Sequence, residues 1–208
     1  MSEAKPRPST GRGFASAYRN MNLANKLTVS RIVLAGVFIF CLFVRGVGAK
    51  FTALAVFLTA SITDYYDGLI ARRSGSITDF GKLMDPIADK ILILGGFLAF
   101  VEMKIIPAWM VMVIIARELV ITGIRVLALS QKKVLAAEVT GKHKTVSQIV
   151  AVLSILLFLI IRDSGFSFRY IDYYAKGVYV LMLICITMTL TSGISFMLRN
   201  KYIFTGEK

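Results

Sequence analysis

Long apolar runs, separated by short polar segments, dominate this sequence. Each run comes close to the roughly 20 residues with which an α-helix crosses a bilayer. The runs cover residues 27–45, 51–72, 81–102, 107–129, 142–161 and 175–198. The pattern predicts an all-α integral membrane protein with six transmembrane helices.

The segment before the first run is polar and basic. Residues 1–13 contain prolines and are expected to be disordered. Residues 14–24 place aromatic and apolar side chains at helical spacing beside Arg19, which predicts a short interfacial helix on the membrane surface. We therefore expect one six-helix membrane domain over residues 25–200, followed by a C-terminal tail over 201–208.

Composition excludes an ordinary soluble domain, because 56% of the residues are hydrophobic and only 18% are charged. The net charge is +13, from 25 Lys and Arg against 12 acidic residues. The basic residues concentrate before the first run, in alternate connections and after the last run, which predicts cytoplasmic termini. The surplus suits membrane lipids with anionic headgroups or a phosphorylated substrate, and we expect no nucleic-acid partner.

Acidic residues concentrate where the second run ends and the third begins. Asp64 and Asp67 lie near the end of one predicted helix, and Asp85 and Asp89 near the start of the next. Each pair is spaced so that its members share a helix face. Because one carboxylate inside a membrane helix costs about 2.5–3.5 kcal/mol on insertion scales, four of them favour a compensating cation. Oxygen ligands without nearby His or Cys favour Mg²⁺, Mn²⁺ or Ca²⁺.

The acidic cluster also allows two alternative interpretations. The carboxylates could be neutralised by neighbouring basic residues such as Arg72, Arg73, Lys82 and Lys90. They could also form the ion site of a divalent cation transporter, because ionisable residues inside membranes mark ion paths. A transporter site is expected near the bilayer midplane, whereas these acids lie close to the basic cytoplasmic segments.

Residues 64–89 carry a further pattern of small and basic residues around the four aspartates. Its defining positions are Asp64, Asp67, Gly68, Ala71, Arg72, Gly81, Asp85 and Asp89. This pattern resembles the signature of the CDP-alcohol phosphotransferase family. The resemblance implies transfer of a phosphatidyl group from CDP-diacylglycerol to an alcohol, with release of CMP. It also implies a homodimer in a bacterial inner membrane with its active site on the cytoplasmic side.

The resemblance assigns roles to individual residues. Asp64, Asp67, Asp85 and Asp89 would bind one or two Mg²⁺ or Mn²⁺ ions. Asp89 and Asp85 would be catalytic, with Asp89 as the general base. CDP-diacylglycerol would be held by Gly68, Ala71, Arg72, Thr78, Gly81, Asn25, Thr28 and Arg31. For the last three, the alternatives are helix capping and an arginine that reaches the inner surface.

Four basic residues are candidates for binding an anionic acceptor: Arg117, Arg125, Lys142 and Lys144. The Gly141-Lys-His-Lys-Thr145 run and the Arg117–Glu118 pair resemble the family branch whose acceptor is sn-glycerol 3-phosphate. Inositol phosphate or another alcohol is the alternative acceptor. Two plainer interpretations are an ion pair between Glu118 and Arg125 and lysines that only set orientation.

Overall fold

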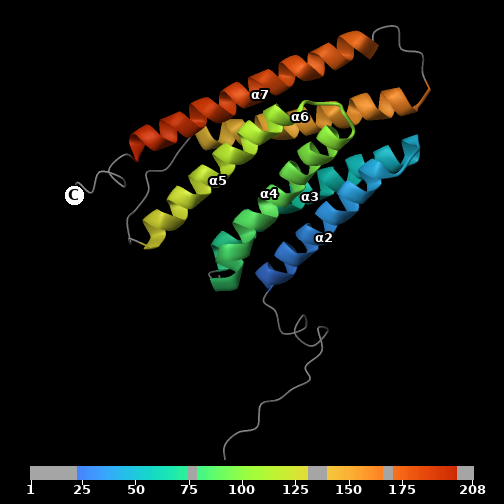
Figure 1. Ribbon diagram of the computed structural model, residues 1–208. Helices are drawn as coiled ribbons and strands as arrows, with labels where there is room; N and C mark the ends of the chain where they lie inside the picture. Colours follow the sequence, from blue (N-terminus) through green and yellow to red (C-terminus); the bar gives the residue numbers. More distant parts are fainter. Residues whose placement is uncertain (1–22, 75–78, 131–139, 166–170, 201–208) are drawn as a thin grey trace, which may run out of the picture.

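The described part of the chain is helical and contains no strand. The computed structural model describes residues 23–74, 79–130, 140–165 and 171–200, with side chains at 29–63, 90–128, 144–165 and 171–200. The helices in these ranges are α2 (Leu23–Phe43), α3 (Val47–Ser74), α4 (Asp79–Glu102), α5 (Ala108–Ser130), α6 (Thr140–Asp163) and α7 (Ile171–Arg199) (Figure 1). The expected interfacial helix falls mostly on residues outside the described ranges.

Each apolar run corresponds to one helix, and the ends differ by a few residues. The largest differences are at the N-terminal ends of α2, α3 and α7, which begin at Leu23, Val47 and Ile171. There the helices include polar residues such as Lys50 and Asp172. Hydropathy marks the apolar length of a helix, whereas backbone hydrogen bonds continue into polar residues at its ends.

The turn after α4 closes the helix with a Schellman motif. The Ile105 amide donates to the Phe100 carbonyl at 3.0 Å, and the Lys104 amide donates to the Val101 carbonyl at 2.9 Å. Lys104 has a positive φ of 57°, the left-handed conformation that this motif needs. The short turn sends α5 back alongside α4.

Lys50 stabilises the turn between α2 and α3 through hydrogen bonds. Its side chain is buried, and its ammonium donates to the Leu42 carbonyl at 2.5 Å and to the Val44 carbonyl at 2.7 Å. These carbonyls lie at the C-terminal end of α2, where backbone acceptors lack helical partners and the helix dipole attracts a cation.

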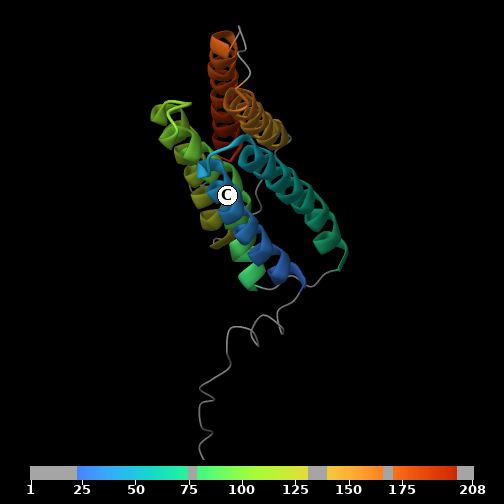
Figure 2. The ribbon, with the colours of Figure 1, turned by 90° about the vertical axis from the view of Figure 1, so that its right-hand side faces the viewer.

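The helices pack as two groups that share one apolar core. Helix α2 lies against α3 and α4, while α7 lies against α5 and α6 (Figures 1 and 2). Contacts of α6 with α3 and α4, and of α4 with α5, join the groups. Small residues allow close packing, since a Cβ on Gly96 of α4 would lie 3.0 Å from the Phe38 ring of α2.

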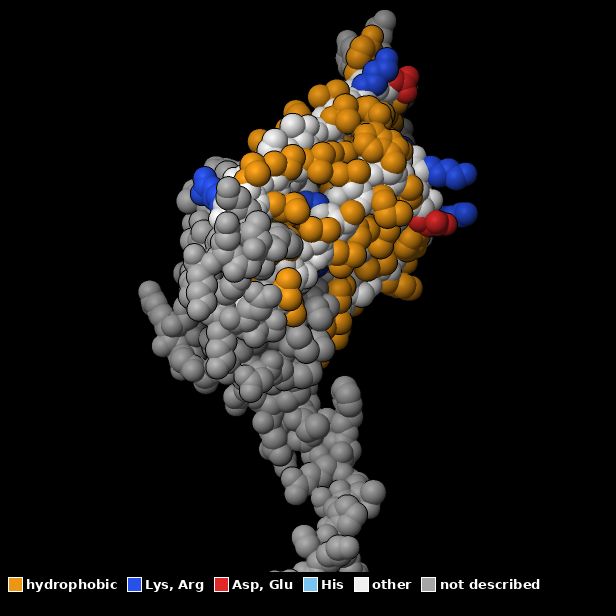
Figure 3. All heavy atoms as spheres, turned by 60° about the vertical axis from the view of Figure 1, so that its left-hand side comes forward, with side chains coloured by type: hydrophobic (Ala, Val, Ile, Leu, Met, Phe, Trp, Pro, Cys, Tyr) orange, Lys and Arg blue, Asp and Glu red, His pale blue; other side chains and the backbone are white. Residues whose placement is uncertain are grey.

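The outer surface of the helices is strongly apolar. Hydrophobic side chains cover most of the coloured surface in Figure 3, and examples more than 60% exposed are Phe40, Met112 and Leu198. Apolar exposure on this scale is unusual for a soluble monomer and suits contact with lipid. Within the described residues, Lys144–Asp163 and Ile171–Arg199 are long and apolar enough to cross a membrane.

Candidate functional site

The four aspartates of the signature lie on two consecutive helices. Asp64 and Asp67 belong to the C-terminal part of α3, and Asp85 and Asp89 to the N-terminal part of α4. Only residues 75–78 connect the two helices, so both pairs lie near one connection. The side chains of residues 64–89 fall outside the described part, so the facing of the two pairs stays a prediction.

The residues expected to hold CDP-diacylglycerol are distributed over the same helices and α2. Gly68, Ala71 and Arg72 lie on α3, and Gly81 lies on α4. Thr78 lies outside the described residues, and Asn25 and Thr28 belong to the first turns of α2 without described side chains.

Arg31 is the member of this nucleotide set whose side chain is described. It is on α2 and only 6% exposed. The bundle therefore encloses the arginine, which disfavours the alternative of a side chain reaching the inner surface. A buried guanidinium requires polar or anionic interaction partners.

A buried charged cluster lies directly beside the signature. Glu118 of α5 is only 5% exposed and forms ion pairs with Lys90 of α4, Arg117 of α5 and Lys144 of α6. The Lys90 Nζ to Glu118 Oε2 distance is 3.7 Å, and the Arg117 to Glu118 Oε1 distance is 3.2 Å. We call these four residues the Glu118 cluster. Lys90 directly follows Asp89, the expected general base, in the sequence of α4.

Hydrogen bonds from neighbouring residues fix the Glu118 cluster. Arg117 donates to Ser192 Oγ of α7 at 2.9 Å, and Lys90 donates to Thr122 Oγ1 of α5. Thr122 in turn donates to the Glu118 carbonyl at 2.7 Å. Four helices, α4 to α7, therefore contribute to one polar site inside an otherwise apolar bundle.

The structure corrects one sequence-based interpretation of the charged residues. Glu118 pairs with the three cations of its cluster and not with Arg125, which is exposed and lies 5.7 Å from the centre of the Phe196 ring. Lys90 contacts Glu118 and Thr122, and its expected pairing with the aspartates, whose side chains lie outside the described part, stays a prediction. Residues this far apart in sequence come together only in the fold, and no sequence signal indicated the pairing.

The four candidate acceptor residues are not all equivalent. Arg117 and Lys144 meet in the Glu118 cluster, whereas Arg125 lies on the exposed surface of α5. Lys142 belongs to the first turn of α6, and its side chain lies outside the described part. The described residues therefore bring together two of the four and add Lys90.

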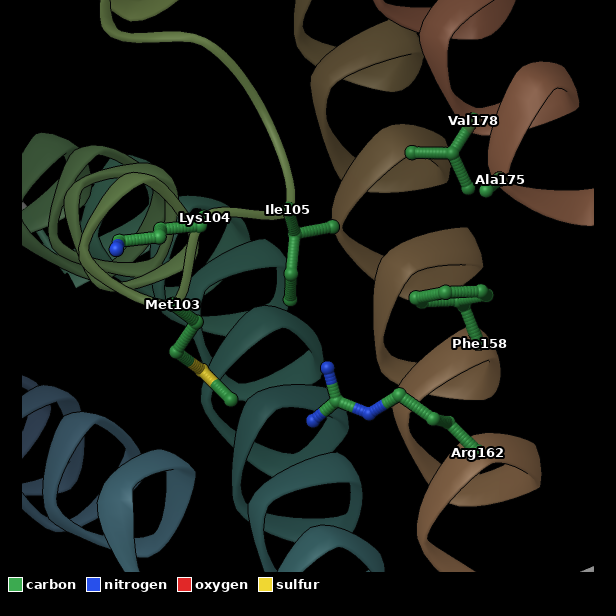
Figure 4. Close-up of a pocket in the computed structure, with 7 residues that line it drawn as sticks. All are labelled: Met103, Lys104, Ile105, Phe158, Arg162, Ala175 and Val178. Atoms are coloured by element: carbon green, nitrogen blue, oxygen red, sulfur yellow. The ribbon is translucent and has the colours of Figure 1, made fainter. Parts of the chain in front are cut away.

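A pocket of about 180 Å³ lies at the other end of α4, away from the signature. In Figure 4, Phe158 and Arg162 of α6 project toward the turn that follows α4. Arg162 is paired with Asp163 at 3.0 Å. The full lining is Met103, Lys104, Ile105, Phe158, Arg162, Ala175 and Val178. The pocket holds none of the sequence-predicted site residues and is a separate feature.

Within the side chains that the structure describes, no group of three His, Cys, Asp or Glu residues is placed to hold a metal. The four signature aspartates lie outside that set. Their donor chemistry nevertheless fits a hard divalent cation, since all four are carboxylates on adjacent turns of two connected helices.

The part of the chain that matches a known protein family includes the signature. Residues 21–191 match the family model described as CDP-alcohol phosphatidyltransferase. The chain is 39% identical over 148 residues to a Bacillus subtilis (strain 168) protein named CDP-diacylglycerol--glycerol-3-phosphate 3-phosphatidyltransferase, covering 65% of this chain and 77% of that protein.

Two other relatives extend the similarity. A Mycobacterium tuberculosis (strain H37Rv) protein named probable phosphatidylglycerophosphate synthase is 43% identical over 148 residues, which is 70% of each chain. A Rickettsia bellii (strain RML369-C) protein with the same name as the Bacillus relative is 30% identical over 183 residues, covering 88% of this chain and 97% of that protein.

Proposed function

Since the chain belongs to the CDP-alcohol phosphatidyltransferase family, we propose that it transfers the phosphatidyl group of CDP-diacylglycerol to sn-glycerol 3-phosphate. The products are phosphatidylglycerophosphate and CMP, and the reaction serves phospholipid biosynthesis. The names of the relatives support this acceptor. The observation that supports this acceptor is the Glu118 cluster, whose buried positive charge suits an acceptor with a phosphate group and whose Lys90 directly follows Asp89 in α4.

In this proposal one set of residues binds the donor substrate, CDP-diacylglycerol, and another set binds the acceptor. Gly68, Ala71 and Gly81 leave space for CDP-diacylglycerol. The planar Arg72 guanidinium donates paired hydrogen bonds to the phosphates of that substrate. Thr78, Asn25, Thr28 and Arg31 complete the proposed set for the cytidine nucleotide. The acceptor phosphate is bound by Arg117 and Lys144, with Lys142 and Arg125 as further basic residues.

Asp64, Asp67, Asp85 and Asp89 would hold one or two divalent cations, Mg²⁺ or Mn²⁺. When bound, such an ion supplies Lewis-acid polarisation of a phosphoryl oxygen and offsets negative charge. The carboxylates also require it, because four of them near one helix connection repel each other. In this proposal Asp85 and Asp89 are metal ligands and also the two catalytic residues.

Asp89 acts as the general base. It accepts the proton of the attacking acceptor hydroxyl while the hydroxyl oxygen forms a bond to the phosphorus of the phosphatidyl group. The bond between that phosphorus and the oxygen of CMP breaks, and CMP leaves with the electron pair. The displacement is direct, because the defining positions of the signature include no Ser, Cys or His nucleophile.

The architecture proposed for this reaction has all six helices crossing the bilayer, with both termini and the active site on the cytoplasmic side of a bacterial inner membrane. The acyl chains of the donor then stay in the lipid while glycerol 3-phosphate arrives from the cytosol. We expect a homodimer, and the apolar faces of α4 and α5 are candidate contact surfaces.

The test is CMP release from CDP-diacylglycerol by purified protein in detergent with Mg²⁺, with each acceptor offered alone. We expect turnover with glycerol 3-phosphate and none with serine or phosphatidylglycerol. Asp89→Asn should lower the rate by about 100-fold to 10,000-fold, because it removes the base. Asp172→Asn, an exposed aspartate at the start of α7, is the matched control.

Two further outcomes separate the alternatives. Turnover with inositol phosphate would keep the chemistry and change the acceptor. Metal binding by folded protein without CMP release from any acceptor would favour the divalent cation transporter.

A further inference from the structure

We propose that Glu118 is a positioning residue that gathers Lys90, Arg117 and Lys144 into one anion site, and that Lys90 is an additional contact for the acceptor's phosphate. The identity of that acceptor rests on the proposed function. The anion site itself rests on the contacts of the described residues.

The geometry brings three cations from three helices to one carboxylate. Lys90 comes from α4, Arg117 from α5 and Lys144 from α6, and each lies in contact with Glu118. Lys144 and Arg117 both meet Oε1, while Lys90 meets Oε2. A single carboxylate thus fixes the relative positions of three helices at this depth of the bundle.

Among the described side chains, the Glu118 cluster carries more positive than negative charge. Among the side chains that the structure describes, Glu118 is the only carboxylate in contact with the three cations. The Arg117 and Glu118 side chains are each 7% exposed, and that of Lys144 is 14% exposed. Uncompensated positive charge in so enclosed a place is unfavourable, and a phosphate dianion would balance it.

One buried donor of the cluster and a second one near it lack hydrogen-bond acceptors among the described residues. Within the described part of the chain, Arg117 Nε and Gln148 Nε2 have no hydrogen-bond partner. Gln148 is 4% exposed and lies one helical turn from Lys144 on the same face of α6. Buried donors are normally satisfied, and an oxygen-rich anion offers several acceptors at once.

The position of Lys90 connects this anion site to the chemistry. Lys90 follows Asp89 directly on α4, so a phosphate in contact with Lys90 is held by the helix that carries the proposed base. Its ammonium is oriented by Glu118 and by Thr122 of α5. Glu118 therefore acts through Lys90 and Lys144 and does not itself need to touch the substrate.

A purely structural salt bridge would behave differently. Removing a carboxylate that serves only to neutralise charge would lower the stability of the protein. It would not change the Michaelis constant of one substrate more than that of the other. A positioning role instead predicts a change in the Michaelis constant of the phosphate-bearing acceptor alone.

The experiment compares Glu118→Gln and Lys90→Gln with the exposed controls Glu102→Gln and Lys176→Gln. We expect KM for glycerol 3-phosphate to rise about tenfold to a hundredfold in both cluster variants, as for loss of a charge-assisted contact. KM for CDP-diacylglycerol should change less than about twofold, within the range of a surface substitution. Glu118→Asp, which keeps the charge and shortens the reach, should lie between wild type and Glu118→Gln.

A second readout uses inorganic phosphate without donor or acceptor. Phosphate should raise the melting temperature of the wild type and of both controls, and should have a smaller effect on the cluster variants. This assay tests the anion site even if the enzyme proves to use another acceptor, which only the CMP-release assay would reveal.

The proposal is overturned if phosphate fails to stabilise the wild type. It is also overturned if the cluster variants keep the wild-type acceptor KM, or if KM for both substrates rises equally. Should Glu118→Gln not fold, Lys90→Gln is sufficient to test the proposal, because that side chain is 27% exposed and its replacement leaves no enclosed unpaired cation.

Discussion

At the scale of single residues, Glu118 shows how one side chain can organise a membrane site. An isolated carboxylate or ammonium inside the bundle would be costly, but the contacts among Glu118, Lys90, Arg117 and Lys144 reduce that cost. Ser192 and Thr122 add neutral partners. The same contacts that make burial tolerable also fix where positive charge is presented.

Gly193 of α7 provides the space for Arg117. A Cβ at this position would lie 3.1 Å from Arg117 Cγ and 3.3 Å from its Nε. Because Arg117 is held by both Glu118 and Ser192, it cannot easily move aside. We expect Gly193→Ala to lower the free energy of unfolding by about 1–3 kcal/mol, as overpacking does, and to raise KM for the acceptor.

Thermal unfolding in detergent and the CMP-release assay measure both effects. Gly177→Ala on the same helix is the matched control, since a Cβ there would meet nothing within 4 Å. Alanine is the better helix former, so this control should gain up to about 1 kcal/mol. Equal behaviour of the two variants would contradict the crowding of Arg117.

At the scale of helices, the turns carry as much specific chemistry as the apolar faces. Lys50 satisfies carbonyls at the end of α2, and Lys104 adopts the left-handed conformation that ends α4. Lys50 lies in the first turn of α3 and Lys104 in the turn after α4, yet the first is buried and the second is exposed. Neither role follows from the sequence, because hydropathy and signatures contain no information on backbone acceptors.

Lys50→Met tests how much the hydrogen bonds of Lys50 between α2 and α3 contribute to stability. The variant keeps the length of the side chain but leaves the Leu42 and Val44 carbonyls without this donor. Hydrogen bonds from charged groups contribute about 1.5–3 kcal/mol, so we expect a loss of that order in the free energy of unfolding. Thermal unfolding in detergent measures it, with the exposed Lys104→Met as control. A loss no larger than in the control would show that the two bonds contribute little.

At the scale of the whole molecule, an apolar exterior surrounds a polar site. The described helices expose many large hydrophobic side chains, while the charges of the Glu118 cluster lie inside. This distribution suits an enzyme whose donor is a lipid and whose acceptor is soluble in water. The separate pocket at the far end of α4 is lined by none of the residues to which the proposed reaction assigns a role.

The proposed topology gives a direct prediction for intact cells. In a variant with Cys41 and Cys185 replaced by Ala, a single cysteine is introduced as Ser164→Cys or Ser76→Cys. Ser164 is exposed just after α6, and Ser76 lies in the connection between α3 and α4. A membrane-impermeant maleimide should label the first in intact cells and the second only after lysis, because basic connections stay cytoplasmic. The reverse pattern would place the active site outside.

The sequence by itself determined the six helices and the position of the signature, because apolar length and helical spacing are local properties. The signature's spacing also identified the family before any contact was known. Tertiary structure alone decided that Glu118 pairs with Lys90 and Lys144 and not with Arg125, that Gly193 makes room for Arg117, and that Lys50 is buried. The contacts of Glu118 and Arg117 depend on how α4, α5, α6 and α7 rotate and approach one another, and the burial of Lys50 depends on how α3 meets the end of α2. A buried charge pairs with whichever partner that packing brings within reach.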